Sequence, residues 1–115
     1  MLPNRMYLDS QTEENLKRLK SYTGITPNIS ARIAFFRSIE SGFIYQPNEK
    51  KLNGSLVLDK ITWLGETVVA TELLLKMKYS DLESKELMAA WAAHVEDGIS
   101  SIRNHKSLLN LVDSI

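Results

Sequence analysis

The chain has 115 residues, 43% hydrophobic and 24% charged, with 14 basic and 14 acidic side chains and no cysteine. This composition is that of a globular domain able to bury one core, so we expect a single domain over residues 1–115. The lack of cysteine excludes disulfides, thiolate nucleophiles and cysteine-ligated metal sites, and fits a reducing, cytoplasmic location. The sequence has neither the pattern of a signal peptide nor an apolar run long enough to span a membrane.

The N-terminal residues predict a short strand followed by a helix. Residues 5–9 alternate between apolar and polar side chains, as a half-buried strand does. Ser10 and Glu13 have the spacing of a capping box, in which each side chain accepts from the other residue's backbone amide. The helix that starts there should end at Gly24, a residue suited to the left-handed conformation that closes many helices.

A second helix should follow after a short turn. Thr26 is expected to cap it, and Pro27 fits its first position because the missing N–H would have no partner there. Gly42 ends the pattern, and the apolar stripe consists of Ile29, Ile33, Phe36 and Ile39. One strand and two helices within residues 1–42 resemble a ribbon-helix-helix unit. Such a unit pairs its strand with that of a second copy, and its ribbons and helix ends grip DNA.

Residues 43–60 predict a loop or short strands, with 56–58 as a second short strand. A long third helix, capped by Asp59 or Thr62, should run to about residue 79 with Gly65 inside it. A fourth helix should start at a second capping box, residues 80–83, and run to about residue 103, with Gly98 as a point where it could divide. The apolar tail, 108–115, should dock as a short terminal helix. The expected fold is therefore mainly α, with the ribbon-helix-helix-like unit (1–42) extended by further helices (61–115).

Charge is unevenly distributed along the chain. From residue 15 to residue 39 the charged side chains are all basic, namely Lys17, Arg18, Lys20, Arg32 and Arg37. Residues 1–60 carry nine basic and six acidic side chains, hence +3, and residues 61–115 carry five and eight, hence −3. A basic first half and an acidic second half suit one surface for a polyanion and another for protein partners. The alternative is that these cations form an ordinary solvated helix face.

The sequence contains none of the common catalytic motifs. Nothing in it matches a phosphate-binding loop, a dinucleotide fingerprint, a nucleophile elbow or a zinc-protease helix. His94 and Asp97 could form part of a metal site, but no third ligand has a clear source. We therefore expect no catalytic residue, no metal and no cofactor.

The residues better suggest DNA binding through phosphates. The N-terminus of the second helix offers free backbone amides, and cations lie before and after it. The candidate contacts are Arg5, Lys17, Arg18, Lys20, Asn28, Ser30, Arg32, Lys50 and Lys51. Most of these groups would reach the DNA backbone, which favours affinity with little sequence reading.

Several short blocks together resemble the DndE family of bacterial DNA phosphorothioation (DNA sulfur modification). The blocks are Leu2–Arg5, Thr23–Asn28, Ser38–Glu40, Leu64–Glu66 and His94–Gly98, so the resemblance covers essentially the full length. It implies a non-catalytic subunit that assembles as a homo-oligomer, a tetramer by expectation, and prefers nicked double-stranded DNA. It also implies work alongside a cysteine desulfurase, a sulfur-transferring enzyme and an ATPase, and it supports Lys17 and Lys20 as DNA contacts. The acidic pair Glu96 and Asp97 departs from the basic character expected of a DNA contact.

Two other functions are compatible with the residues. A sequence-specific ribbon-helix-helix repressor or antitoxin would read bases with the outward strand face, which Arg5 and Tyr7 could serve. A helical protein–protein adaptor would bind no DNA and would dock a partner through the acidic second half.

Overall fold

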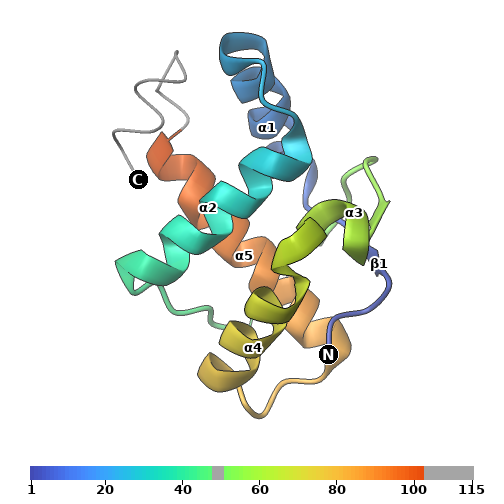
Figure 1. The fold of residues 1–115 in the computed structure, drawn as a ribbon, viewed down its shortest axis with the longest axis vertical. Coiled ribbons are helices and arrows are strands. Elements are labelled where there is room, and N and C mark those ends of the chain that lie inside the picture. Colours follow the sequence, from blue (N-terminus) through green and yellow to red (C-terminus); the bar gives the residue numbers. More distant parts are fainter. Residues whose placement is uncertain (48–50, 103–115) are drawn as a thin grey trace.

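The computed structural model describes residues 1–47 and 51–102. In chain order the elements are β1 (Arg5–Met6), α1 (Ser10–Thr23), α2 (Pro27–Ser41), β2 (Leu58–Asp59), α3 (Lys60–Leu64), the 3-10 turn η1 (Gly65–Thr67), α4 (Val68–Lys78) and α5 (Ser84–Ile102). The mainly α class is confirmed, with a short strand and two helices first and further helices after them (Figure 1). The predicted terminal helix at 108–115 lies outside the described residues.

The long helices α2 and α5 form the centre of the fold, and they share the most extensive contact of any pair of elements. Helix α5 runs unbroken through Gly98, so the predicted division there is wrong. A Cβ built on Gly98 would overlap the backbone of Ala34 on α2. The glycine therefore allows the two helix backbones to approach closely, rather than ending a helix.

The N-terminal strand is shorter than predicted and pairs within its own chain. It spans two residues and runs antiparallel to β2, with Arg5 opposite Asp59 and Met6 opposite Leu58. Further along, the Gly54 amide donates to the Leu8 carbonyl at 2.8 Å. The segment before α3 thus runs back beside the N-terminal segment and supplies hydrogen-bond partners for its backbone. Within the chain the ladder partner of β1 is β2, and the pairing of β1 with a second copy stays a prediction.

Helix α1 begins differently from the predicted capping box. Asp9 is the N-cap, and its carboxylate accepts from the Thr12 amide at 3.0 Å. The Ser10 amide donates to Asn53 Oδ1 at 3.0 Å, so Glu13 does not accept from it. The predicted end of the helix is confirmed, since Gly24 follows it with a φ of 76°.

The next helix also begins as predicted, with Thr26 in the N-cap position and Pro27 at the start of α2. Its Thr26 hydroxyl, however, donates to the Asn28 side chain at 2.6 Å rather than capping the helix.

The predicted third helix is two helices joined by a 3-10 turn. Asp59 occupies the N-cap position of α3, as expected, but Gly65 has φ 53° and ψ −132°, which the interior of an α-helix does not accommodate. A Cβ on Gly65 would meet the guanidinium of Arg32 at 2.8 Å. The predicted second capping box is also wrong, because residues 79–83 form a turn in which the Leu82 amide donates to the Tyr79 carbonyl at 3.2 Å.

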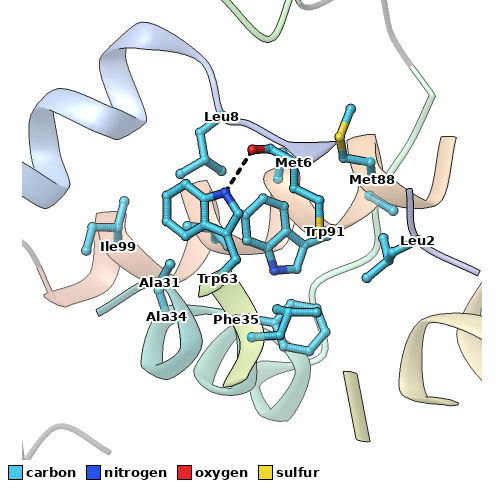
Figure 2. Close-up of a cluster of buried hydrophobic side chains, with 14 of the residues drawn as sticks. Leu2, Met6, Leu8, Ala31, Ala34, Phe35, Trp63, Met88, Trp91 and Ile99 are labelled. Carbon is cyan, nitrogen blue, oxygen red and sulfur yellow. Dashed lines mark hydrogen bonds between the residues drawn. The ribbon is translucent and has the colours of Figure 1, made fainter. Parts of the chain in front are cut away.

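The core is built around two tryptophans that come from α3 and α5. The rings of Trp63 and Trp91 lie 5.5 Å apart at 61°, and both side chains are fully buried. The Trp63 indole N–H donates to the Met6 carbonyl at 2.8 Å, which ties β1 to α3 (Figure 2). Phe35 of α2 completes the centre of this cluster. Within the described ranges, no helix combines the length and apolar character that a membrane crossing would need.

Candidate nucleic-acid interface

Helix α1 presents the exposed basic face. Leu16 and Leu19 are buried against the core, whereas Lys17, Arg18 and Lys20 are exposed. This arrangement follows from helical spacing, because residues three apart share a face and their neighbours point away from it. Within residues 1–47 and 51–102, Arg18 and Lys20 have no ion-pair partner. Their charges are therefore available to a polyanion.

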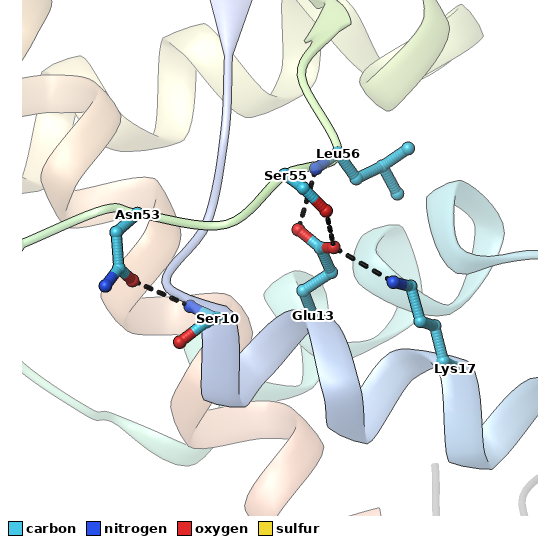
Figure 3. A network of polar contacts seen from close by, with 6 residues as sticks. All are labelled: Ser10, Glu13, Lys17, Asn53, Ser55 and Leu56. Carbon is cyan, nitrogen blue, oxygen red and sulfur yellow. Dashed lines mark hydrogen bonds and ion pairs between the residues drawn. The ribbon is translucent and has the colours of Figure 1, made fainter.

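Glu13 anchors this helix to the segment before β2 (Figure 3). Its carboxylate accepts from the Ser55 hydroxyl at 2.7 Å and from the Leu56 amide at 2.8 Å, and it pairs with Lys17 at 3.1 Å. Burial alone would raise the pKa of Glu13, but the hydrogen bonds from Leu56, Ser55 and Lys17 outweigh it and hold the pKa below its ordinary value of 4.5. The buried carboxylate is therefore ionised, and it fixes the root of the basic face.

Within the described residues, Lys17 is the one predicted contact of α1 whose side chain has an ion-pair partner. Its side chain remains 54% exposed even though its ammonium pairs with the buried Glu13. The pair is a spacing-of-four pair on one helix, which orients the lysine along the helix surface. Lys17 can thus face a phosphate while its position is restricted.

The predicted contacts on the strand and the following loop lie at the surface. Arg5 is 72% exposed and pairs with the equally exposed Asp59 at 3.5 Å, an interaction that water weakens. Lys51 is exposed. Lys50 lies outside the described residues. The acidic neighbour of Arg5 makes that position less positive than the sequence alone indicated.

The predicted DNA contacts on α2 are instead buried or bonded to other residues of the same chain. Arg32 donates from Nε to the Trp63 carbonyl at 2.7 Å and from Nη2 to the Thr62 carbonyl at 2.9 Å, so its guanidinium closes the end of α3. The Asn28 amide also donates to the Thr62 carbonyl, at 3.2 Å. Ser30 is fully buried. Among the predicted helix contacts in the described residues, the cations without an ion pair or hydrogen bond are therefore Arg18 and Lys20 of α1, whereas Asn28 and Arg32 of α2 hold α3 in place.

A partly buried polar chain that sequence reasoning missed joins α2, the segments that follow α2 and α4, and α5. The Tyr45 amide donates to the Tyr79 hydroxyl at 2.7 Å, which lies 2.7 Å from His94 Nε2. His94 Nδ1 lies 2.8 Å from the Ser38 hydroxyl, which donates to Asp97 at 2.8 Å. Because Ser38 has one hydrogen and gives it to the carboxylate, His94 must donate from Nδ1 and accept at Nε2. The chain therefore runs in one direction and ends on Asp97.

This chain needs a neutral histidine. Burial, and to a smaller extent the nearby Lys78 charge, together lower the pKa of His94 to about 4. The spacing of His94 and Asp97 on one helix was the sequence signal, but the bridging Ser38 comes from α2, 56 residues earlier. Among the residues that the structure describes, no group of three metal-ligating side chains comes together.

Comparison with known proteins identifies the family. The family model described as "DNA sulphur modification protein DndE" matches residues 5–110. The chain belongs to the DndE family. A crystal structure of DndE from Escherichia coli B7A, involved in DNA phosphorothioation modification, is 73% identical, with a TM-score of 0.83 over 87% of this chain and 97% of that one.

A second DndE structure gives the same result. It is a crystal structure of a glycine-to-lysine mutant of DndE involved in DNA phosphorothioation, 67% identical to this chain. The TM-score is 0.84, and the match covers 89% of this chain and 99% of the other. A search of curated protein sequences found no significant match. The predicted family is thus confirmed, and the same fold is found in solved DndE structures.

Proposed function

We propose that this protein is a non-catalytic DNA-binding subunit of the bacterial machinery that replaces a phosphate oxygen of DNA by sulfur. Membership of the DndE family and likeness to DndE proteins involved in DNA phosphorothioation support the system. The observation that carries DNA binding is the exposed trio Lys17, Arg18 and Lys20 on the surface of α1, rigidly held at Glu13. Cations of this kind bind phosphates irrespective of base sequence.

The preferred ligand in this proposal is nicked duplex DNA. A duplex with one broken strand bends more readily at the break, so a basic surface can contact phosphates on both sides with a smaller deformation energy. Several copies in a homo-oligomer, a tetramer by expectation, would multiply these contacts. The protein would act in the cytoplasm with a cysteine desulfurase, a sulfur-transferring enzyme and an ATPase.

The intramolecular strand pair weighs against the repressor alternative. Proteins of that class read bases with a ribbon made from the strands of two copies. Here β1 pairs with β2 of its own chain, with Arg5 opposite Asp59 and paired to it at 3.5 Å. The outward strand face is therefore not a bare base-reading surface.

The test is a titration of intact and singly nicked duplexes of identical sequence at several salt concentrations. The wild type should bind the nicked duplex more tightly on any sequence. Lys17→Ala combined with Lys20→Ala should weaken binding on all sequences and reduce the slope of log K against log salt by roughly one unit or less per lost contact.

The matched control combines Lys76→Ala with Lys85→Ala, which removes the same charge from exposed positions on α4 and α5. It should leave the salt slope near that of the wild type. An equal loss in both double variants would mean that net charge rather than α1 governs binding. Tight binding to a single sequence would favour the repressor, and no binding to either duplex would favour the adaptor.

A further inference from the structure

Helix α4 has one buried and one bare apolar face. Thr71 and Leu75 are completely buried against the body of the protein. On the opposite side, Val69, Leu73 and Met77 are 75%, 57% and 73% exposed. Their spacing of four residues places them on one continuous stripe along the helix. A regular stripe of large apolar side chains differs from the scattered single ones found on most surfaces, and it indicates a binding face.

The charged residues of α4 divide between these faces. Glu72 is buried, accepts from the Leu2 amide at 2.9 Å and pairs with Lys60 at 3.1 Å, so it belongs to the body of the protein. Lys76 is exposed beside the stripe and, in the described part of the chain, forms no ion pair. The outer face of α4 therefore combines an apolar stripe with one exposed lysine on its flank.

This combination does not complement a second copy of itself in an antiparallel two-fold pair. In an antiparallel pair related by a two-fold axis, the same flank of both helices meets, so the Lys76 flanks would face each other. A two-fold interface has to be self-complementary, because each residue contacts what its counterpart contacts. The Glu72 carboxylate near this flank is already occupied by Lys60. The charge pattern thus favours a different partner, one whose flank is acidic.

We propose that the outer face of α4 docks an amphipathic helix of another protein, with apolar residues at spacings of three and four and Asp or Glu along one flank. The apolar residues of that helix would cover Val69, Leu73 and Met77, and its carboxylates would pair with Lys76. The contact would pair two amphipathic helices along their apolar stripes, where a few apolar anchors give affinity and charges select the partner. The proposal is independent of DNA binding through α1.

The test uses the full chain and two synthetic helical peptides of about 20 residues, a length at which isolated helices become stable. Both carry leucines at spacings of three and four, and they differ only in glutamates or lysines at the flank. Backbone amide shifts of the labelled protein give both the site and the affinity. The glutamate peptide should bind more tightly, and it should shift the amides of α4.

Variants make the test specific. Leu73→Glu should weaken the binding of the glutamate peptide at least tenfold. Lys76→Glu should make the protein bind the lysine peptide more tightly than the glutamate peptide. The control is Ile44→Glu, which changes an apolar side chain that lies outside α4 and is 52% exposed. This variant should bind the glutamate peptide as the wild type does. Folding of each variant is verified by its amide spectrum, and unchanged binding of nicked DNA by Leu73→Glu would separate this surface from the α1 site.

Three results would overturn the proposal. The two peptides could bind equally, the shifted amides could lie away from α4, or the preference could fail to reverse in Lys76→Glu. Sedimentation adds one more, since a fall in the mass of the unliganded protein on Leu73→Glu would show that a second copy covers the stripe.

Discussion

The buried Glu13 gives the sharpest stability prediction, through the substitution Glu13→Gln. The glutamine side chain has the same shape, but it has one acceptor oxygen where the carboxylate has two. If the glutamine oxygen still accepts the hydrogen bond from the Leu56 amide, the glutamine NH₂ group faces Ser55 and Lys17. The hydroxyl can turn and accept, but the lysine has only donors to offer. The lost charge-assisted bonds should lower the free energy of unfolding by about 2 kcal/mol at pH 7.

The pH dependence of this effect has a definite sign. The pKa of Glu13 is below 4.5 in the folded protein, so the unfolded chain takes up a proton first as the solution is acidified. The stabilisation is therefore fully present above pH 4.5, and it is lost as the pH falls through the folded-state pKa. Glutamine cannot ionise. The difference between wild type and Glu13→Gln should thus shrink below pH 4.5.

Urea denaturation at a series of pH values measures both effects. Glu14→Gln is the matched control, because it removes one negative charge from an exposed position next in the chain and should change stability by less than about 0.5 kcal/mol. Equal stability of wild type and Glu13→Gln at pH 7 would refute the anchoring role of the carboxylate. A difference that stays constant down to pH 3 would refute its ionised state.

Two more predictions concern α5. Gly98→Ala should destabilise the fold by about 2–3 kcal/mol or more, because the new methyl group overlaps the backbone of Ala34. The control is Ser100→Ala on the exposed side of the same helix, which should be nearly neutral in chemical denaturation. A neutral Gly98→Ala would show that the two helices can separate freely. His94→Gln should flatten the pH dependence of stability between pH 6.5 and 4, since wild type loses up to roughly 3 kcal/mol there as the unfolded histidine becomes protonated first. The same slope in both proteins would mean that His94 titrates normally.

Local patterns predicted the helices well where the deciding residues lie within the helix itself. The left-handed end of α1 at Gly24 and the start of α2 at Pro27 depend on backbone properties of single residues, which any sequence displays. The exposure of Lys17 and Lys20 followed from helical spacing for the same reason. These features need no knowledge of what the helix packs against.

The failures share a different cause, since each depends on a distant segment. The Glu13 carboxylate could have bonded the Ser10 amide, but the 53–56 segment offers Asn53 to that amide and two donors to the carboxylate. Gly65 was placed inside one continuous helix, whereas Arg32 from α2 binds the carbonyls of Thr62 and Trp63 and ends α3 before it. Such contacts join residues 30 or more positions apart, so periodicity within one helix carries no sign of them.

The two proposed surfaces lie far enough apart to act together. Helix α1 and helix α4 are at opposite ends of the long axis, which measures 38 Å (Figure 1). The screening length at physiological salt is about 8 Å, so charges on α1 and α4 hardly affect each other. DNA on α1 would therefore neither repel nor attract an acidic helix on α4. Simultaneous binding would bring a partner protein to the DNA without any conformational signal through the core, since the effect requires only that both contacts exist on one rigid body.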